Sequence, residues 1–263
     1  MTSPKAPIAP EEILLLAADA ARIVLESGGE TYRAEDTAVG LSSALDGAEA
    51  ECFATPTVIV LSFVGFDGKA HSIVRRVTRR SMNLERVARI DALTRRTRAG
   101  ELDFAGAAAE LDRVERLEGR PPLVSALAAA AGTGFFTLLF GGAWNDALVA
   151  AAVGAGLSRF TRLFARRAIP DFVANLLGAA GATILCLIAR SLGLATSADG
   201  TIIGVIMLLV PGVAITNAIR DTIGGDLVSG VSRGADAFMS AAAISIGAGG
   251  AYQLWNLLAG RIL

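Results

Sequence analysis

The residues best suited to chemistry lie in one stretch near the carboxyl end, 210–233, which has the sequence VPGVAITNAIRDTIGGDLVSGVSR. Asn217, Arg220 and Asp221 fall within one helical turn of each other. A guanidinium can bind a carboxylate group through two parallel hydrogen bonds, and a neighbouring carboxylate offsets the burial of its charge. We therefore predict substrate-binding or gating roles for the following residues of this stretch: Pro211, Gly212, Asn217, Arg220, Asp221, Asp226, Ser229 and Arg233.

The Pro211-Gly212 pair interrupts an apolar segment that is otherwise helical in pattern. Irregular backbone at membrane depth is tolerated only where protein or a water-filled cavity covers it, and broken helices hold charged substrates in many transporters. The charged residues that follow have a second interpretation, as an interfacial loop that obeys the positive-inside rule. Asn175, within another apolar segment, is a further binding candidate, and a structural hydrogen bond between helices explains it equally well.

The elements that must position these residues are membrane helices. Hydrophobic residues make up 53% of the 263 residues, and 35 of the 49 charged residues lie within 1–120. A transmembrane helix needs about 20 apolar residues. We predict an all-α bundle of about five transmembrane helices in 121–263, with these spans: 123–140, 147–165, 171–189, 200–219 and 235–258.

Arginine placement predicts the orientation of this bundle, because cytoplasmic loops carry an excess of positive charge. Four arginines lie at the end of the second predicted span and after it, and Arg220 and Arg233 lie at the end of the fourth and beyond. We expect a multi-pass protein of a bacterial-type inner membrane, in contact with the lipid bilayer. Its amino terminus is expected in the cytoplasm and its carboxyl terminus outside.

Residues 1–120 predict a small cytoplasmic α+β domain with helices on one face of a mainly antiparallel sheet. The apolar run VIVLSFVG is typical of a strand buried on both faces, and Asp67-Gly68 predicts a tight hairpin. The expected helices are 11–27, 31–44, 83–98 and 103–117, and the expected strands are 50–54, 57–65 and 69–77.

Several classes of function lack support in the sequence. His71 is the single histidine, and with Cys52 and Cys186 it forms no group with metal-ligand spacing. We expect no metal and no cofactor. No dense basic stripe predicts nucleic-acid binding, and no nucleophile elbow, P-loop or dinucleotide motif predicts an enzyme. A membrane-anchored enzyme whose soluble domain does the work, and a scaffold subunit, stay as alternatives.

Four motifs in a fixed order resemble the threonine/serine exporter family, including its split, two-subunit members. They are GGETYRAEDTA (28–38), ATPT (54–57), the RR…NL helix start (79–84) and LVPGVAITNAIRD…GD..SG..R (209–233). The resemblance covers nearly the whole chain. It implies a secondary transporter, driven by the proton gradient, that exports small polar metabolites from the cytoplasm. Threonine or serine is the first expectation, and a dicarboxylate such as succinate is the alternative.

The resemblance also implies partners and further site residues. The chain looks like the larger subunit of a split exporter, so a small membrane subunit of about four spans, or self-association, is expected. Capping and strand-starting roles also explain the motif residues of the soluble domain. As candidates for a cytoplasmic gate or sensor, the motifs point to Glu30, Thr31, Arg33, Thr55 and Thr57.

Overall fold

The structure is a computed structural model that describes residues 8–46, 49–65, 68–78, 81–117, 119–167 and 169–259. It contains two compact units. The first unit combines Met1–Gly119 with Val213–Gly234, and the second combines Arg120–Gly212 with Ala235–Leu263. The segment with most of the candidate site residues therefore belongs to the same unit as the amino-terminal domain. The predicted domain boundary near residue 120 stays a prediction.

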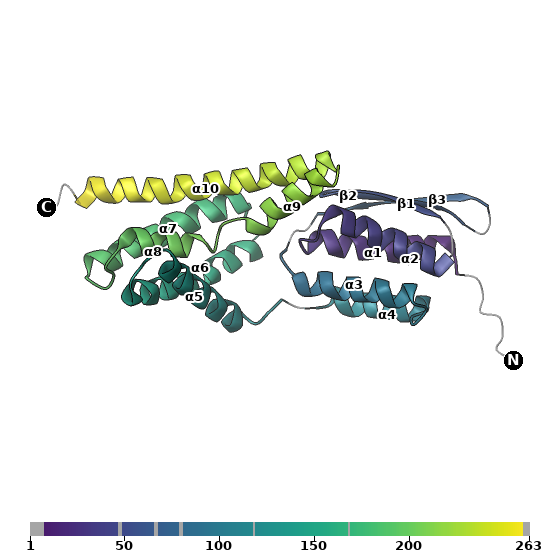
Figure 1. The fold of residues 1–263 in the computed structure, drawn as a ribbon, viewed down its shortest axis with the longest axis horizontal. Coiled ribbons are helices and arrows are strands. Elements are labelled where there is room, and N and C mark those ends of the chain that lie inside the picture. Colours follow the sequence, from purple (N-terminus) through teal and green to yellow (C-terminus); the bar gives the residue numbers. More distant parts are fainter. Residues whose placement is uncertain are drawn as a thin grey trace. The chain divides into compact units, whose positions relative to one another are not determined.

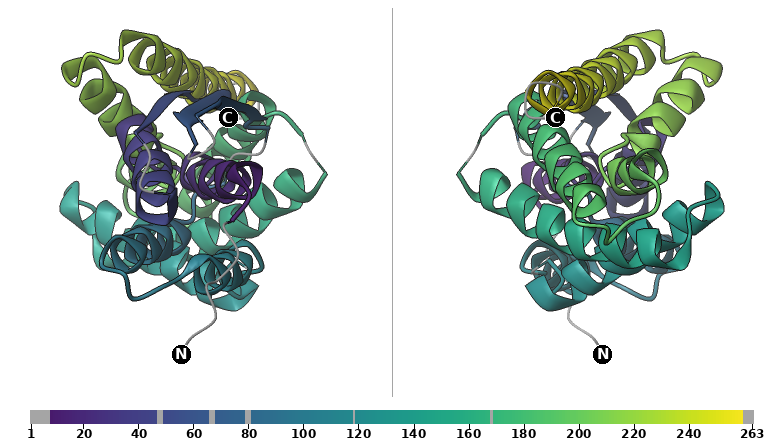
Figure 2. Two further views of the ribbon diagram at one scale, coloured as in Figure 1. Left: turned by 90° about the vertical axis from the view of Figure 1, so that its right-hand side faces the viewer. Right: turned by 90° about the vertical axis from the view of Figure 1, so that its left-hand side faces the viewer.

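The first unit has three layers (Figures 1 and 2). A three-stranded antiparallel sheet, in the order β1-β2-β3, covers α1 and α2, and α3 and α4 pack beneath these two helices. The elements of this unit are α1 (Pro10–Glu26), α2 (Thr31–Asp46), β1 (Ala50–Thr55), β2 (Val58–Val64), β3 (Ala70–Arg76), α3 (Leu84–Arg98), α4 (Phe104–Glu115), nearly all of α9 (Gly212–Ile223) and the first residues of α10 (Leu227–Ala259).

The predicted α+β order is confirmed, with one correction. The strand around VIVLSFVG is buried on one face only, because side chains of β2 alternate between the core and the surface. Ile59, Leu61 and Phe63 are at most 2% exposed, whereas Val60 and Val64 are 37% and 56% exposed. Helices cover only one side of this sheet, so only one face of β2 is buried. A continuous apolar run does not show whether one or both faces of a strand are buried. The predicted hairpin residue Asp67, and Arg79 and Arg80, lie outside the described residues.

The second unit is helical, and α5, α6, α7 and α8 pack against one another. Its elements are α5 (Pro122–Leu139), α6 (Trp144–Arg166), α7 (Asp171–Ser191), α8 (Ala198–Ile206) and the larger part of α10. Small residues allow close approach of these helices. A Cβ atom added to Gly247 of α10, for example, would collide with the backbone carbonyl oxygen of Leu176 in α7.

Within the described residues, three helices are long and apolar enough to cross a membrane: α5, α6 and α7. The predicted span 200–219 is not one helix, because the chain leaves helical geometry between Ile206 and Gly212 and forms the shorter helices α8 and α9. Proline at 211 lacks the N–H that a continuous helix needs there. The predicted span 235–258 lies within α10. A count of five spans and the orientation of the helices stay predictions.

One carboxylate of the helical unit is deeply buried. Asp146, in the first turn of α6, is 1% exposed. Its two oxygens accept hydrogen bonds from the backbone N–H groups of Ala143 (2.9 Å), Thr196 (2.6 Å) and Ser197 (3.0 Å). These bonds cap α6 and hold the chain at the beginning of α8, so Asp146 has a structural role.

Candidate functional site

The polar segment after Pro211 folds as a helical hairpin, made of α9 and the first residues of α10. Gly225 makes the turn with a φ of +92°, a conformation that glycine adopts without strain. Asp226 caps α10, since its Oδ1 accepts the N–H of Ser229 at 3.2 Å. Gly230 lets the two helices approach, because an added Cβ would lie 3.0 Å from the carbonyl oxygen of Ala218. Gly225 therefore permits the turn of the hairpin, and Gly230 permits the close approach of its two helices.

The loop 28–31, which joins α1 to α2, contacts this hairpin. Gly28 has a φ of +86° and ends α1, so the chain turns sharply and the loop exposes backbone carbonyl oxygens. Nδ2 of Asn217 donates to the carbonyl oxygen of Gly28 at 3.0 Å, and Nη2 of Arg233 donates to that of Gly29 at 2.9 Å. We call this arrangement the loop–hairpin contact, made by residues 28–31 and Val213–Gly234.

Asp221 is the centre of the loop–hairpin contact. Its side chain is fully buried, and Nε of Arg233 lies 3.0 Å from its Oδ2. Thr31 donates to the same carboxylate through its hydroxyl group at 3.2 Å and its N–H at 3.4 Å. Because Thr31 begins α2, Asp221 places a negative charge at the positive end of that helix dipole. Asp221 thus caps a helix that lies 190 positions earlier in the chain.

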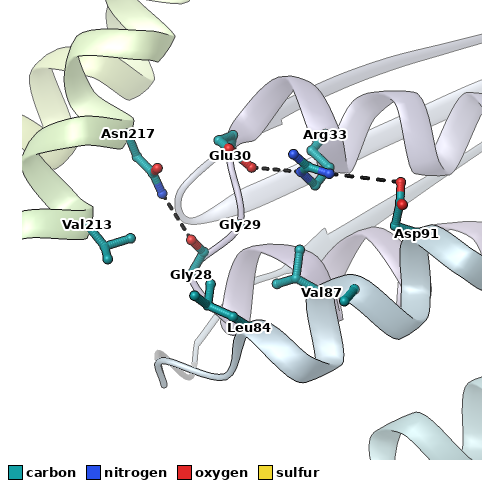
Figure 3. Close-up of a pocket in the computed structure, with 10 residues that line it drawn as sticks. Gly28, Gly29, Glu30, Arg33, Leu84, Val87, Asp91, Val213 and Asn217 are labelled. Carbon is teal, nitrogen blue, oxygen red and sulfur yellow. Dashed lines mark hydrogen bonds and ion pairs between the residues drawn. The ribbon is translucent and has the colours of Figure 1, made fainter.

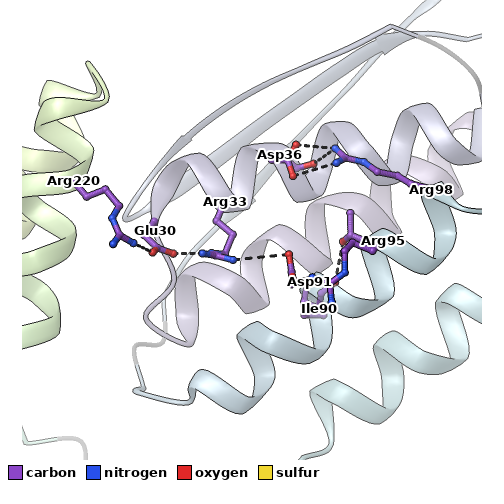
Figure 4. A network of polar contacts seen from close by, with 9 residues as sticks. Glu30, Arg33, Asp36, Ile90, Asp91, Arg95, Arg98 and Arg220 are labelled. Atoms are coloured by element: carbon purple, nitrogen blue, oxygen red, sulfur yellow. Dashed lines mark hydrogen bonds and ion pairs between the residues drawn. The ribbon is translucent and has the colours of Figure 1, made fainter.

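A chain of ion pairs continues from this contact across the domain (Figure 4). Glu30 pairs with Arg220 of α9 on one side and with Nε of Arg33 at 2.8 Å on the other. Arg33 in turn lies 3.9 Å from Asp91 of α3. Burial opposes the ionisation of Glu30, yet the hydrogen bond from Arg33 and the charges of Arg33 and Arg220 hold its pKa below the usual value. Glu30 is therefore a carboxylate at neutral pH.

A cavity of about 350 Å³ opens beside the loop–hairpin contact (Figure 3). Its wall carries charged and amide groups of both polarities together with apolar side chains, so it presents donors and acceptors to a small polar molecule. The volume lies in the range of small-molecule sites. The lining residues are Gly28, Gly29, Glu30, Arg33, Leu84, Val87, Ala88, Asp91, Val213 and Asn217.

A second group of carboxyls lies behind the hairpin. Oε1 of Glu35 accepts the N–H of Ala54 at 2.9 Å. Burial raises the pKa of Glu35 above its usual value, the bond from Ala54 works against this, and the negative charges of Asp226 and Asp221 add to it. Among the described residues, Oδ2 of Asp226 is buried without a hydrogen-bond partner, and so is the hydroxyl group of Ser229. Glu35 differs from Glu30 because no arginine among the described residues forms an ion pair with it.

The structure brings together seven of the residues singled out in the sequence and leaves others apart. Asn217, Arg220, Asp221 and Arg233 meet Glu30, Thr31 and, through Glu30, Arg33. Thr55 and Thr57 instead stabilise the turn between β1 and β2, where Oγ1 of Thr55 accepts the N–H groups of Thr57 at 3.4 Å and of Val58 at 3.2 Å.

Three more candidates lie in the second unit. Pro211 and Gly212 connect α8 with α9, as the break in the sequence pattern predicts. Asn175 is partly exposed on α7, and within the described residues no hydrogen bond joins it to another helix. Both interpretations of Asn175 stay predictions.

Sequence reasoning missed two residues of the site, Glu35 and Asp91. Glu35 lies inside the motif at 28–38, four positions after Thr31, so it falls on the same face of α2. The sequence signal for Glu35 was its place in the first turns of an expected helix, on the same face as the candidate residue Thr31. Asp91 lies in an arginine-rich helix, where an acidic residue is ordinarily interpreted as a surface partner, and nothing local pointed to Arg33.

Comparison with known proteins identifies the class of the molecule. A family model described as "Putative threonine/serine exporter" matches residues 15–255, which is most of the chain and includes both sides of the loop–hairpin contact. The chain belongs to the threonine/serine exporter family. This is a family of membrane transporters, not of enzymes. No solved structure matches the chain.

Curated relatives of this exporter family differ in length. A "Probable threonine/serine exporter" of Mycobacterium tuberculosis is 28% identical over 90% of this chain, and the "Threonine/serine exporter" of Corynebacterium glutamicum is 26% identical over 77%. This chain spans only 45% and 42% of those two proteins. The "Probable succinate transporter subunit YjjP" of Escherichia coli K12 is 23% identical over 89% of this chain and 91% of its own length.

Proposed function

We propose that this chain is a subunit of a secondary transporter that exports small zwitterionic metabolites, threonine or serine first among them. We also propose that substrate binds in the cavity beside the loop–hairpin contact. One observation carries the substrate assignment: the wall contains the guanidinium of Arg33 between the carboxylates of Glu30 and Asp91. A zwitterion offers a carboxylate to the arginine and an ammonium group to the acidic residues.

In the proposed mechanism, the ion pairs of Glu30 with Arg220 and with Arg33 also act as a gate. Arg220 is half exposed while its partner Glu30 is largely buried, so water and substrate reach this ion pair from one side. Substrate that binds Glu30 or Arg33 competes with the existing pairs and loosens the hold of loop 28–31 on the hairpin. Release of substrate restores the pairs. The candidates Asn217, Arg220, Asp221 and Arg233 act in this proposal by holding the loop.

A dicarboxylate is the second candidate substrate. It is favoured by the match over nine-tenths of a relative that is named a succinate transporter subunit. Against it, a dianion in this cavity would face Glu30 and Asp91 with a single arginine between them. Like charges at such distances raise the free energy of binding.

We also propose that the working transporter contains a second membrane subunit. The support is that two relatives which match nearly full length are named as transporter subunits. The cytoplasmic location of the first unit and a proton-driven mechanism complete the proposal.

Efflux from cells that express the chain with its partner tests the substrate assignment. Cells loaded with labelled threonine or labelled succinate are compared, for the wild type and for Arg33→Gln and Arg220→Gln. We expect threonine efflux, and a fall of at least about tenfold in each variant, since each loses one charge-assisted hydrogen bond. Arg113→Gln is the matched control, because Arg113 forms an exposed pair with Glu110 on α4.

The outcomes separate the candidates. Efflux of succinate but not of threonine would show that the substrate is a dianion and not a zwitterion. Wild-type threonine efflux in both variants, at equal amounts of inserted protein, would show that the cavity is not the binding site.

A further inference from the structure

A second cavity, of about 340 Å³, lies in the helical unit between the beginning of α5 and the end of α6. Arg159, Arg162 and Arg166 contribute to its wall at positions three and four apart, so all three project from one face of α6. Pro122, the first residue of α5, also lines it, as do Ser158 and Leu163. Three arginine side chains and the amino-terminal end of α5 therefore line a single cavity.

These arginines differ from those of the first unit. Arg22, for comparison, reaches the carboxylates of Asp19, Glu26 and Glu115. In the part of the chain that the structure describes, no carboxylate forms an ion pair with any of the three cavity arginines. The cavity consequently has an uncompensated positive charge.

Arg162 is held in place by neutral groups. Its Nη2 donates to the carbonyl oxygen of Arg120 at 2.7 Å and to Oγ of Ser125 at 3.4 Å. These contacts fix the guanidinium beside the first turn of α5 and leave its charge unneutralised. The first N–H groups of α5, an 18-residue helix, lack partners within that helix, and they add positive potential at the same place.

The position along the helices indicates the kind of anion. Both α5 and α6 are candidate membrane spans, and the cavity lies between the first residue of α5 and residues 158–166 at the end of α6. The ends of spanning helices meet the lipid headgroups. Leu163 of the cavity wall is 44% exposed, and Leu123 and Leu127, in the first two turns of α5, are 65% and 61% exposed. A ligand with a phosphate group and acyl chains satisfies the charge and the apolar surface together.

We propose that this cavity binds the headgroup phosphate of an anionic phospholipid, with Arg162 as the fixed donor and Arg159 and Arg166 as exposed donors. Free phosphate and dicarboxylates share the anionic chemistry, but they leave the exposed leucines without a partner. The site is independent of the proposed substrate cavity, which lies in the other unit.

Native mass spectrometry of the purified full chain tests the proposal, with palmitoyl-oleoyl phosphatidylglycerol and the matching phosphatidylcholine as probes. We expect retention of phosphatidylglycerol but not of phosphatidylcholine, and an affinity about five- to tenfold lower in Arg162→Gln and in Arg159→Gln. Arg159 is exposed and has no hydrogen bond to another described residue, so its variant is expected to fold. The control is Arg167→Gln, which removes one charge at the same helix end but outside the cavity, and its expected loss is less than about twofold.

Each other outcome overturns the proposal. Equal losses in Arg162→Gln and Arg167→Gln would indicate diffuse attraction to anionic lipid, without a site. Equal retention of both lipids would refute headgroup recognition. Displacement of phosphatidylglycerol by millimolar succinate, or by inorganic phosphate alone, would assign the cavity to a soluble anion.

Discussion

Asp221→Asn removes the negative charge that Arg233 and the first turn of α2 share. The side chains of Asp221 and Arg233 are 0% and 12% exposed, so solvent does not take over the role of the lost carboxylate. The asparagine keeps nearly the same shape and one carbonyl oxygen. The effect of the substitution is therefore one of charge and hydrogen bonding, not of packing.

The expected loss follows from the burial of this pair. Removing one partner of a buried ion pair destabilises by about 3–5 kcal/mol, because the other charge remains buried. The lower end applies here, since Arg233 keeps its hydrogen bond to the carbonyl oxygen of Gly29 and the asparagine oxygen still accepts from Thr31. We expect the opening free energy of the loop–hairpin contact to fall by about 3 kcal/mol, which is roughly a hundredfold in the opening equilibrium.

Hydrogen exchange measured by mass spectrometry on the full chain reports this opening directly. Peptides that contain residues 28–34 should exchange up to about a hundred times faster in Asp221→Asn, and peptides from β2 should not change. The matched control is Asp36→Asn, which removes an exposed carboxylate from the same helix, α2, and should change exchange by less than about fivefold.

A double variant gives the sharpest test. Asp221→Asn combined with Arg233→Gln leaves no unpaired buried charge, so its loss should be smaller than the sum of the two single losses. Strict additivity, or unchanged protection of residues 28–34 in Asp221→Asn, would refute the assignment of this pair as the centre of the contact.

Two further predictions concern other parts of the chain. Gly247→Ala should lower the stability of the helical unit by about 2 kcal/mol, because the added methyl group meets the carbonyl oxygen of Leu176. Gly249→Ala is the control, because its methyl group meets open space, and it should be neutral or slightly stabilising. Thermal unfolding in detergent, followed by tryptophan fluorescence, checks this, and equal midpoints would contradict it. Glu35→Gln should flatten the pH dependence of stability, because a carboxyl whose pKa is raised stabilises the fold at low pH and loses this contribution as the pH rises above about 4.5. The glutamine oxygen still accepts from Ala54. If the melting temperatures of the two proteins change in parallel from pH 4 to pH 8, the pKa of Glu35 is not raised.

Local patterns predicted local structure well. The order of helices and strands in the first unit follows from apolar periodicity, and the interruption at Pro211-Gly212 follows from the chemistry of proline. The single-sided burial of β2 did not follow, because the number of faces that helices cover is a property of the whole domain. Val60 and Val64 are apolar in either case.

The candidate site shows the same limit more clearly. The residues of loop 28–31 and those of the hairpin were both singled out, but no pattern joined them, since periodicity and capping rules relate positions a few residues apart. A physical signal existed in the charges. Asp221 and Arg233 lie in an apolar half of the chain, and buried charges require partners. Which partner each one finds depends on tertiary structure.

The loop–hairpin contact also has a consequence for biosynthesis. It joins residues about 190 positions apart, so a ribosome that has completed loop 28–31 needs roughly 10–40 s to produce the hairpin that it binds. Throughout that interval α2 lacks the carboxylate that caps it, while residues 120–212 emerge first. During that interval the nascent amino-terminal domain persists in this incomplete form. A chain that stops short of residue 234 would retain the sheet and its helices, but it would display an unoccupied surface at loop 28–31 that chaperones and proteases can distinguish from the finished protein.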